Sequence, residues 1–176
     1  MAANKKLLDS VTPLMVSKCS FEKTGLNFNV FLSPEDIPAA AKEMLKKEYY
    51  IEDVDAVDVV EGFLITYHYA RFESAERVAH RVMVTHAEPV VPSISDIYQG
   101  ADWHERECAD FHAIKFSGHP NLLPLLLDPE TPQGVLLKTD KSRKPLRDLI
   151  DFGEFVFTTD GFMPFDEAQA DLKEPK

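Results

Sequence analysis

The sequence predicts an α+β fold in which an antiparallel β-sheet meander carries a helix packed on one face. A helix–turn segment and an extended C-terminal tail are expected to follow. Three observations favour this class. Strand-like runs with short turns fill residues 55–85, apolar residues recur at helical spacing over 37–49, and the nucleotide-binding patterns GxGxxG and GxxxxGK[ST] are absent. Short turns join antiparallel strands, whereas parallel strands need long crossovers.

The first predicted elements are a strand and a helix. Residues 27–32, NFNVFL, alternate polar and apolar side chains as a half-buried strand does. Ser33 and Pro34 are typical of a helix start, because serine caps the free N–H groups and proline fits the first turn. Apolar residues then recur on one face, at Ile37, Ala41, Met44, Leu45 and Tyr49. We expect this amphipathic helix to cover the sheet.

The predicted meander follows the helix. Runs over residues 55–60, 63–72 and 77–85 are rich in β-branched and aromatic residues and are separated by short turns. Two short helices also fit the spacing of apolar residues, one over residues 7–15 and one over residues 93–98.

Composition limits the classes of partner. The 176 residues include 30 acidic and 19 basic ones, a net charge of −11. Nucleic acid and anionic membranes bind clustered Lys and Arg, so neither is expected as a main partner. Two cysteines cannot form a disulfide framework of the secreted kind. Asp9 and Pro13 interrupt the early apolar residues, and no apolar run reaches about 18 residues. We therefore expect a cytoplasmic protein that meets a membrane only through partners.

Residues 101–122, ADWHERECADFHAIKFSGHPNL, hold the only tryptophan and three of the six histidines. The segment up to His112 is predicted to be a helix, with Asp102 as its N-cap and Glu105 as the partner in a capping box. A helical wheel advances by about 100° per residue. On this wheel, one apolar stripe contains Trp103, Phe111 and Ile114 together with two acids, Glu107 and Asp110.

The acids of this helix need partners. Burying an ionised carboxylate alone costs several kcal/mol, and Arg106 is the one arginine near Glu105, Glu107 and Asp110. We therefore expect further positive charge from elsewhere in the fold or from another chain. One alternative is a solvated helix whose acids lie at the edge of the stripe. Another is an enzyme that uses Glu107 and Asp110 as an acid/base pair, but no nucleophile motif accompanies them.

A second pattern on the same helix could bind a metal. His104, Cys108 and His112 lie four residues apart on one edge, with His119 nearby, and thiolate and imidazole ligands suit zinc or iron. Three ligands on one helix drift around its axis, however. The favoured interpretation is an amphipathic edge with a semi-buried cysteine. After the helix, residues 113–116 are predicted to be a short strand and residues 117–120 a tight turn.

Two motifs of this stretch together resemble the signature of a known family. They are Glu105-Arg106-Glu107-x-x-Asp110 and Ile114-x-Phe116-x-Gly118-His119-Pro120-Asn121-Leu122. This pattern resembles that of the 30 kDa subunit of respiratory complex I (NADH-quinone oxidoreductase), also called its C-type subunit. The preceding helix and meander are similar to that family's α+β domain, so the resemblance covers about residues 27–122.

The resemblance implies a non-catalytic structural subunit, without a cofactor or metal, in the hydrophilic arm of an NADH:quinone oxidoreductase. Such a protein docks on the hydrogenase-like large subunit of complex I, its D-type subunit, near the quinone site and on the cytoplasmic side of the membrane. The acids of the helix would then be held by cations partly from within the chain and partly across the interface. The signature and interface residues implied are Trp103, Glu105, Arg106, Glu107, Asp110, Gly118, His119 and Pro120.

Other functions remain open at this point. One is the equivalent subunit of an energy-converting hydrogenase or a coenzyme F420-linked dehydrogenase. Another is a stand-alone metal-binding or hydrolytic domain that uses His104, Cys108, His112 and His119, and a third is a generic acidic adaptor. The expected organisation is an N-terminal extension (1–26), the family-like domain (27–122) and an extended, partly disordered acidic tail (123–176).

Overall fold

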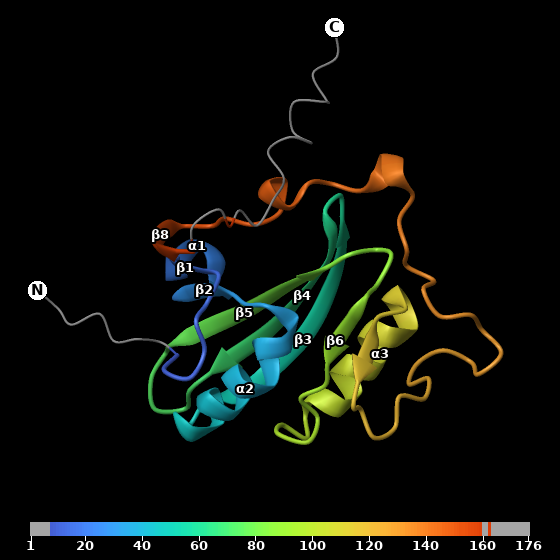
Figure 1. Cartoon of the computed structure of the whole chain (residues 1–176), viewed down its shortest axis with the longest axis horizontal. Coiled ribbons are helices and arrows are strands. Elements are labelled where there is room, and N and C mark those ends of the chain that lie inside the picture. Colours follow the sequence, from blue (N-terminus) through green and yellow to red (C-terminus); the bar gives the residue numbers. More distant parts are fainter. Residues whose placement is uncertain (1–7, 160–161, 163–176) are drawn as a thin grey trace, which may run out of the picture.

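A computed structural model describes residues 8–159 and residue 162. Its main sheet has six strands in the order β3-β4-β5-β2-β1-β8 (Figure 1). The strands are β1 (Met15–Lys18), β2 (Phe28–Phe31), β3 (Tyr50–Val59), β4 (Gly62–Ala70), β5 (Arg77–Val84) and β8 (Glu154–Thr158). A second, two-stranded sheet pairs β6 (Val90–Pro92) with β7 (Lys115–Ser117). The helices are α1 (Phe21–Thr24), α2 (Ile37–Lys46) and α3 (Ala101–His112), with 3-10 turns η1 (Pro34–Asp36), η2 (Asp140–Ser142) and η3 (Leu146–Asp148).

The predicted α+β class with an antiparallel meander is confirmed. β3, β4 and β5 pair antiparallel in chain order, as their short turns indicate. β3 begins at Tyr50, five residues before the predicted strand. β2 matches the predicted first strand, and it lies inside the sheet, parallel to β5 and antiparallel to β1. The sheet is therefore mixed but mostly antiparallel.

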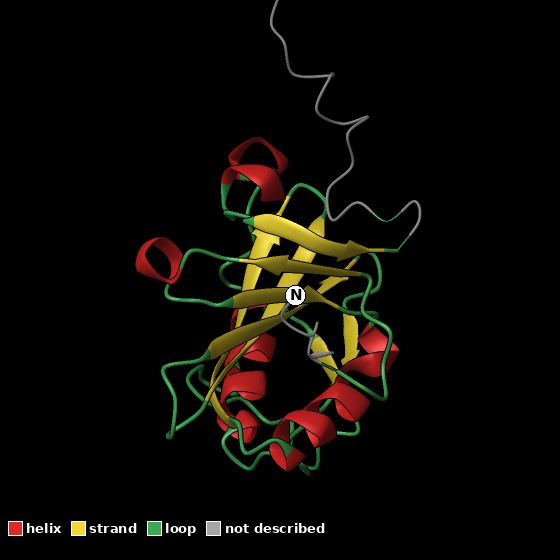
Figure 2. Cartoon of the chain, turned by 90° about the vertical axis from the view of Figure 1, so that its left-hand side faces the viewer, coloured by secondary structure: helices red, strands yellow, loops and turns green. Residues whose placement is uncertain are grey.

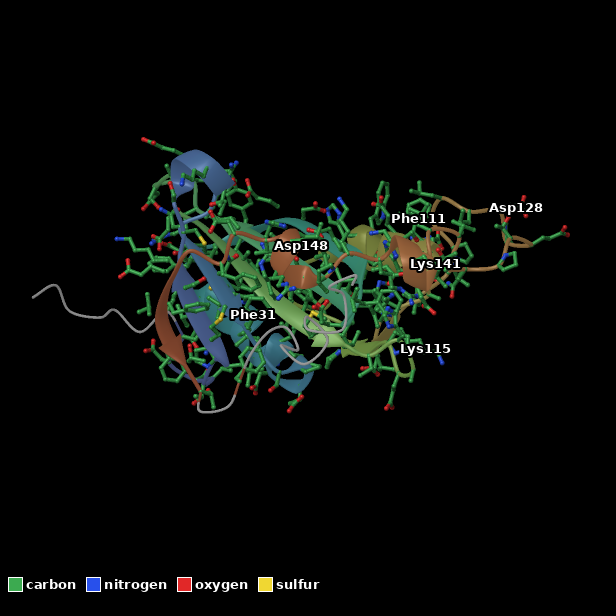
Figure 3. All side chains as sticks on the ribbon, turned by 90° about the horizontal axis from the view of Figure 1, so that it is seen from above. Phe31, Phe111, Lys115, Asp128, Lys141 and Asp148 are labelled. Carbon is green, nitrogen blue, oxygen red and sulfur yellow. The ribbon has the colours of Figure 1, made fainter. Side chains whose placement is uncertain are left out.

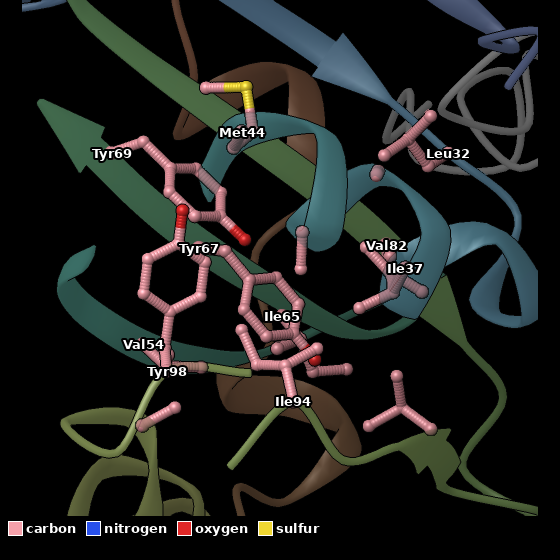
Figure 4. Close-up of a cluster of buried hydrophobic side chains, with 14 of the residues drawn as sticks. Leu32, Ile37, Met44, Val54, Ile65, Tyr67, Tyr69, Val82, Ile94 and Tyr98 are labelled. Carbon is pink, nitrogen blue, oxygen red and sulfur yellow. The ribbon is translucent and has the colours of Figure 1, made fainter. Parts of the chain in front are cut away.

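The two long helices lie on the same side of the sheet (Figure 2). α2 presents Ile37, Ala41 and Met44 to the core, as its periodic pattern predicts. The pattern is wrong for Leu45, which is 49% exposed, and Tyr49 lies after the helix ends. Facing it, β4 and β5 contribute large buried side chains (Figure 4). Among them are Ile65, Tyr67, Tyr69 and Val82. Removing this apolar surface from water is the main driving force that holds α2 on the sheet.

Both short helices predicted from apolar spacing are wrong. Residues 8–14 contain no helix, because Leu8 and Val11 reach the core from an extended approach to β1. Residues 95–97 form a turn, closed by hydrogen bonds from Ile97 and Tyr98 to the Ile94 carbonyl. In both places burial in the tertiary structure, rather than a helical face, explains the apolar spacing.

The C-terminal part of the chain returns to the main sheet. Residues 138–146, here the strap, cross the β3–β4 hairpin, where Val60 N–H donates to the Lys144 carbonyl and Glu61 accepts the Leu146 N–H. β8 then pairs antiparallel with β1. The division at residues 26 and 122 stays a prediction, and β1 and β8 show that the first and last segments both contribute strands.

Candidate functional site

α3 positions the signature residues, but its buried face differs from the predicted stripe. The residues turned inward are Ala101, Glu105, Cys108, Ala109 and Asp110. Trp103 is 66% exposed and Glu107 is exposed too, so the predicted apolar stripe is wrong at these two residues, whereas its members Asp110 and Ile114 are buried. Small residues face the sheet because they let α3 approach β3 closely, and the bulky Trp103 is left on the outside.

Glu105 is fully buried and holds the segment before α3. Its carboxylate accepts hydrogen bonds from the Ser93 hydroxyl at 2.5 Å and the Ile94 N–H at 2.8 Å. The predicted capping box with Asp102 is therefore wrong, and α3 begins instead after Gly100 without a side-chain cap. Burial raises the pKa of Glu105 to about 7, because desolvation outweighs these two hydrogen bonds and nearby acids disfavour a further charge.

His119 lies against Glu105 from the turn after β7. Its side chain is fully buried, with Nε2 3.1 Å from Asp102 Oδ1 and 3.9 Å from Glu105 Oε2. Its Nδ1 accepts the N–H of Asn121. Gly118 adopts φ +83°, a left-handed conformation that glycine tolerates best, and so allows the predicted turn. The signature turn is thus attached to the N-terminal half of α3.

Asp110 is fully buried and binds backbone rather than a cation. Its Oδ2 accepts the N–H groups of three consecutive residues, at 2.9, 2.8 and 3.2 Å. They are Leu125, Leu126 and Leu127. Arg106 does not pair with Asp110 but donates to the carbonyls of Leu123 and Pro124. Among the described residues, no Lys or Arg pairs with Glu105 or Asp110, which are bound by N–H and O–H donors of this chain. The expectation of cations from another chain stays a prediction.

The histidine–cysteine pattern runs along the outer edge of β3. His104 Nδ1 lies 2.9 Å from Asp53 Oδ1, and the Cys108 thiol donates to the Val54 carbonyl at 3.5 Å. His112 hydrogen-bonds the backbone of Ala56, two residues further along β3. Burial raises the pKa of Cys108 above its usual range, which keeps the thiol protonated as a donor. These residues cover a sheet edge, as the favoured interpretation of an amphipathic edge implies.

The four candidate metal ligands are not brought together. His104, Cys108 and His112 point at β3, whereas His119 contacts Asp102 and Glu105. Within residues 8–159, no group of three or more His, Cys, Asp or Glu side chains has the arrangement to hold a metal ion. The structure gives the alternative of a stand-alone metal-binding domain no geometric support.

An exposed apolar surface borders α3, and we call it the α3 surface. Its members are between 47% and 66% exposed: Trp103, Leu123, Leu126, Val135, Leu136 and Leu137. The loop that carries most of them is fixed to α3, because the carbonyls of Asp110 and Phe111 accept the N–H groups of Gly134 and Leu136. Figure 3 shows this loop projecting past Phe111 toward Asp128. A large exposed apolar surface is typical of a protein–protein contact.

Residues 123–137 were missed as part of the site. Their signal in the sequence is the pair of apolar runs Leu125–Leu127 and Val135–Leu137. Both runs lie among prolines, so neither fits a regular strand or helix that would bury it on one face. Of the implied interface residues, Trp103 and Glu107 are exposed, and Glu105 and Asp110 are buried. Exposure therefore distinguishes residues that can contact a partner from buried residues that hold the surface in place.

Comparison with known proteins identifies the family. The family model for the respiratory-chain NADH dehydrogenase 30 kDa subunit matches residues 30–153. The chain belongs to this family. The resemblance carried by the signature is thus confirmed, and the match extends beyond residue 122 into the strap.

Relatives of the 30 kDa subunit family include separate and fused proteins. The C-type subunit of the Roseiflexus castenholzii NADH-quinone oxidoreductase is 31% identical over 121 residues, which cover 65% of this chain and 69% of the relative. A fused C/D-type subunit of the Bacteroides thetaiotaomicron enzyme is 39% identical over 77 residues, which cover 43% of this chain but only 14% of the relative. The match is therefore confined to a small part of the fused protein.

A solved structure shares the fold of this 30 kDa family member. A chain of the membrane-bound sulfane sulfur reductase, an archaeal respiratory membrane complex, superposes with a TM-score of 0.56 at 20% identity. The match covers 69% of this chain and 74% of that chain, and at this identity it shows the fold alone. Among the described residues, no helix has the length and apolar character needed to span a bilayer.

Proposed function

We propose that the chain is a non-catalytic, cofactor-free structural subunit of the hydrophilic arm of an NADH:quinone oxidoreductase, and that it docks on the hydrogenase-like large subunit, the D-type subunit, near the quinone site. Membership of the 30 kDa subunit family supports this role. The names of the fused C/D-type relatives also support it, because two subunits joined in one chain work in the same complex. The protein would lie on the cytoplasmic side of the membrane and reach it only through partners.

The α3 surface is the proposed docking site. Trp103 projects from the outward side of α3, and Arg106, three residues later on the same helix, binds the Leu123 carbonyl. Tryptophan and arginine are enriched among the residues that dominate binding energy at interfaces. Glu107 adds an exposed acid that can pair with a basic residue of the partner. This exposed apolar surface, built on the family signature, is the observation that carries the proposal.

The buried signature residues have a supporting role in this proposal. Asp110 fixes the loop that carries Leu126, and Glu105 with His119 fixes the segments at the other end of α3. Gly118 and Pro120 shape the turn that delivers His119. These residues would affect docking only by fixing the position of the α3 surface. Burial prevents Glu105, Asp110 and the His119 side chain from contacting a partner.

Co-expression with the D-type large subunit of the same organism tests the proposal. The wild-type pair should co-purify, and the double substitution Trp103→Ala with Leu126→Ala should weaken the complex at least about 30-fold, the usual effect of losing a hot spot. Phe72→Ala is the matched control, because Phe72 is 86% exposed but lies outside the α3 surface. Failure of the wild-type pair to associate would overturn the proposed function. Equal weakening by Phe72→Ala would overturn the proposed surface.

A further inference from the structure

The main sheet has two edge strands, β3 and β8, and α3 covers the β3 edge. There Cys108 and His112 bond to carbonyl and backbone groups that β3 would otherwise leave open. Covering an edge with a helix is one way in which proteins prevent unwanted strand pairing. At the opposite edge lies β8, and its only neighbour in the described part of the sheet is β1.

β8 has only part of the protection that an edge strand usually has, namely one β-bulge and the charge of Glu154. All five of its residues are exposed, and its centre is Phe155, Val156 and Phe157, at 53%, 45% and 43% exposure. It contains neither proline nor lysine. Its register with β1 passes from Val16–Phe157 to Ser17–Phe155, so β8 carries one β-bulge, at Val156. An exposed apolar edge of this kind is suited to accept another strand, with backbone hydrogen bonds giving affinity and side chains giving specificity.

Charge decides which strand fits. Three exposed acids lie at or just before β8, namely Asp148, Asp151 and Glu154. A second copy of this chain would bring the same acids and its own net charge of −11. The chain's last 17 residues (160–176) contain five acids and two lysines, so they also carry the unfavourable sign. A basic partner strand is the occupant that this edge favours, since complementary charge both attracts and selects partners.

We propose that β8 is a second docking site, at which an extended segment with an apolar centre and flanking Lys or Arg from another protein extends the six-stranded sheet. This site is separate from the α3 surface, because β8 and α3 lie at opposite ends of the molecule (Figure 1). The chain then bridges two neighbours in an assembly. This inference goes beyond the proposed function and does not require that the D-type large subunit bind.

Peptide binding to the isolated full-length chain tests the site. The probe is the blocked peptide Lys-Thr-Val-Thr-Val-Lys, and the matched control is Glu-Thr-Val-Thr-Val-Glu, which has the same centre with opposite charge. We expect saturable shifts of the amide resonances of residues 154–158 with the basic peptide, and at least tenfold weaker binding of the acidic one. Exchange of these amides with solvent should slow by a similar factor in the complex.

Substitutions and oligomeric state make the test decisive. Val156→Lys keeps the backbone donor but places a like charge against the basic probe, so binding should fall at least tenfold. Leu45→Lys, at a residue of α2 that is 49% exposed, should leave binding unchanged. A probe with N-methylated valines, which cannot donate backbone hydrogen bonds, should not bind. Equal binding of both peptides, shifts outside β8, or no binding would overturn the proposal. A dimer of the unliganded chain that Val156→Lys dissociates would assign the edge to a second copy instead.

Discussion

At the scale of single residues, Glu105 shows how a buried acid can organise a site without a cation. Its carboxylate fixes Ser93 and Ile94, and His119 packs against it. The energetic consequence is a pKa near 7, because burial penalises the charged form more than the two hydrogen bonds stabilise it. The protonation of Glu105 is therefore linked to the stability of the fold around neutral pH.

Glu105→Gln should change the pH dependence of stability. The carboxyl loses its proton near pH 4.5 in the unfolded chain but near pH 7 in the folded one, so between these values the folded state binds more protons. The free energy of unfolding therefore falls as pH rises from about 4.5 to 7, by on the order of 3 kcal/mol from this group. Below pH 4.5 and above pH 7 the group contributes no slope.

Urea denaturation between pH 4 and pH 8 measures this effect. In Glu105→Gln the free energy of unfolding should fall less between pH 4.5 and 7 than it does in the wild type. The stability of the variant relative to the wild type should therefore be higher at pH 8 than at pH 4. Glu107→Gln is the control on the same helix, because Glu107 is exposed and outside the cluster. A Glu105→Gln slope identical to that of the wild type would contradict the linkage.

At the scale of elements, the C-terminal end of α3 carries a conformational cost. Ala113 adopts φ +56°, in the left-handed region that glycine enters without penalty. The Ala113 N–H still closes the helix by donating to the Ala109 carbonyl. The turn that leads into β7 and the signature is thus formed by a residue that does not favour it.

Ala113→Gly should therefore stabilise the protein, by up to about 1 kcal/mol. The same exchange at Ala109, inside the helix and fully packed, should destabilise it by about 1 kcal/mol or more, because glycine costs entropy there and leaves a gap. Thermal and chemical denaturation of the two variants give the comparison. Destabilisation by both would show that the left-handed turn imposes no strain on Ala113.

Elements differ in how far the sequence predicts them. α2 and the β3–β5 meander follow from periodicity and short turns, since each of these elements buries one regular face on its neighbours. α3 does not, because three separate segments surround it: β3, the Ser93–Ile94 segment and the loop after Leu122. A wheel drawn for one apolar stripe cannot anticipate acids that are buried by backbone donors from distant segments.

The candidate site could be predicted only in part, because hydrogen bonds between distant segments position it too. The signature located α3 and its turn correctly, and Trp103 and Glu107 are exposed as an interface requires. Leu123, Leu126 and the 135–137 segment were missed, because their relation to Trp103 depends on hydrogen bonds made by Arg106 and Asp110 across the loop. β8 was missed because its partner β1 lies at the other end of the sequence.

At the scale of the whole molecule, Asp58 connects the strap to the sheet. This fully buried carboxylate accepts hydrogen bonds from the Lys138 N–H at 2.8 Å and Arg143 Nε at 2.6 Å, and His86 Nε2 lies 2.8 Å away. Burial alone would raise the pKa of Asp58, but these partners, Arg143 foremost, lower it below its usual value. Asp58 therefore joins the end of β3 to both Lys138 and Arg143 of the strap.

Asp58→Asn should destabilise the whole fold by about 3 kcal/mol, because it leaves His86 without its anion and leaves Arg143 with only the exposed Asp140. It should also expose the strap to trypsin, which cleaves after Lys138, Lys141 and Arg143. Asp140→Asn is the control, because the Asp140 side chain is almost fully exposed and contacts Arg143 only at the surface. Digestion time courses followed by mass spectrometry would contradict the role of Asp58 if both variants were cut at the wild-type rate.

The pairing of β1 with β8 has a consequence for the order of synthesis. Met15 pairs with Thr158, so β1 leaves the ribosome well before the strand that it pairs with. At the usual 5–20 residues per second, that wait lasts roughly 10–30 s. During this time β1 is the open edge of a nascent sheet, and chaperones or premature aggregation compete for it. A chain truncated before residue 154 would lack β8, so β1 would remain an open edge strand.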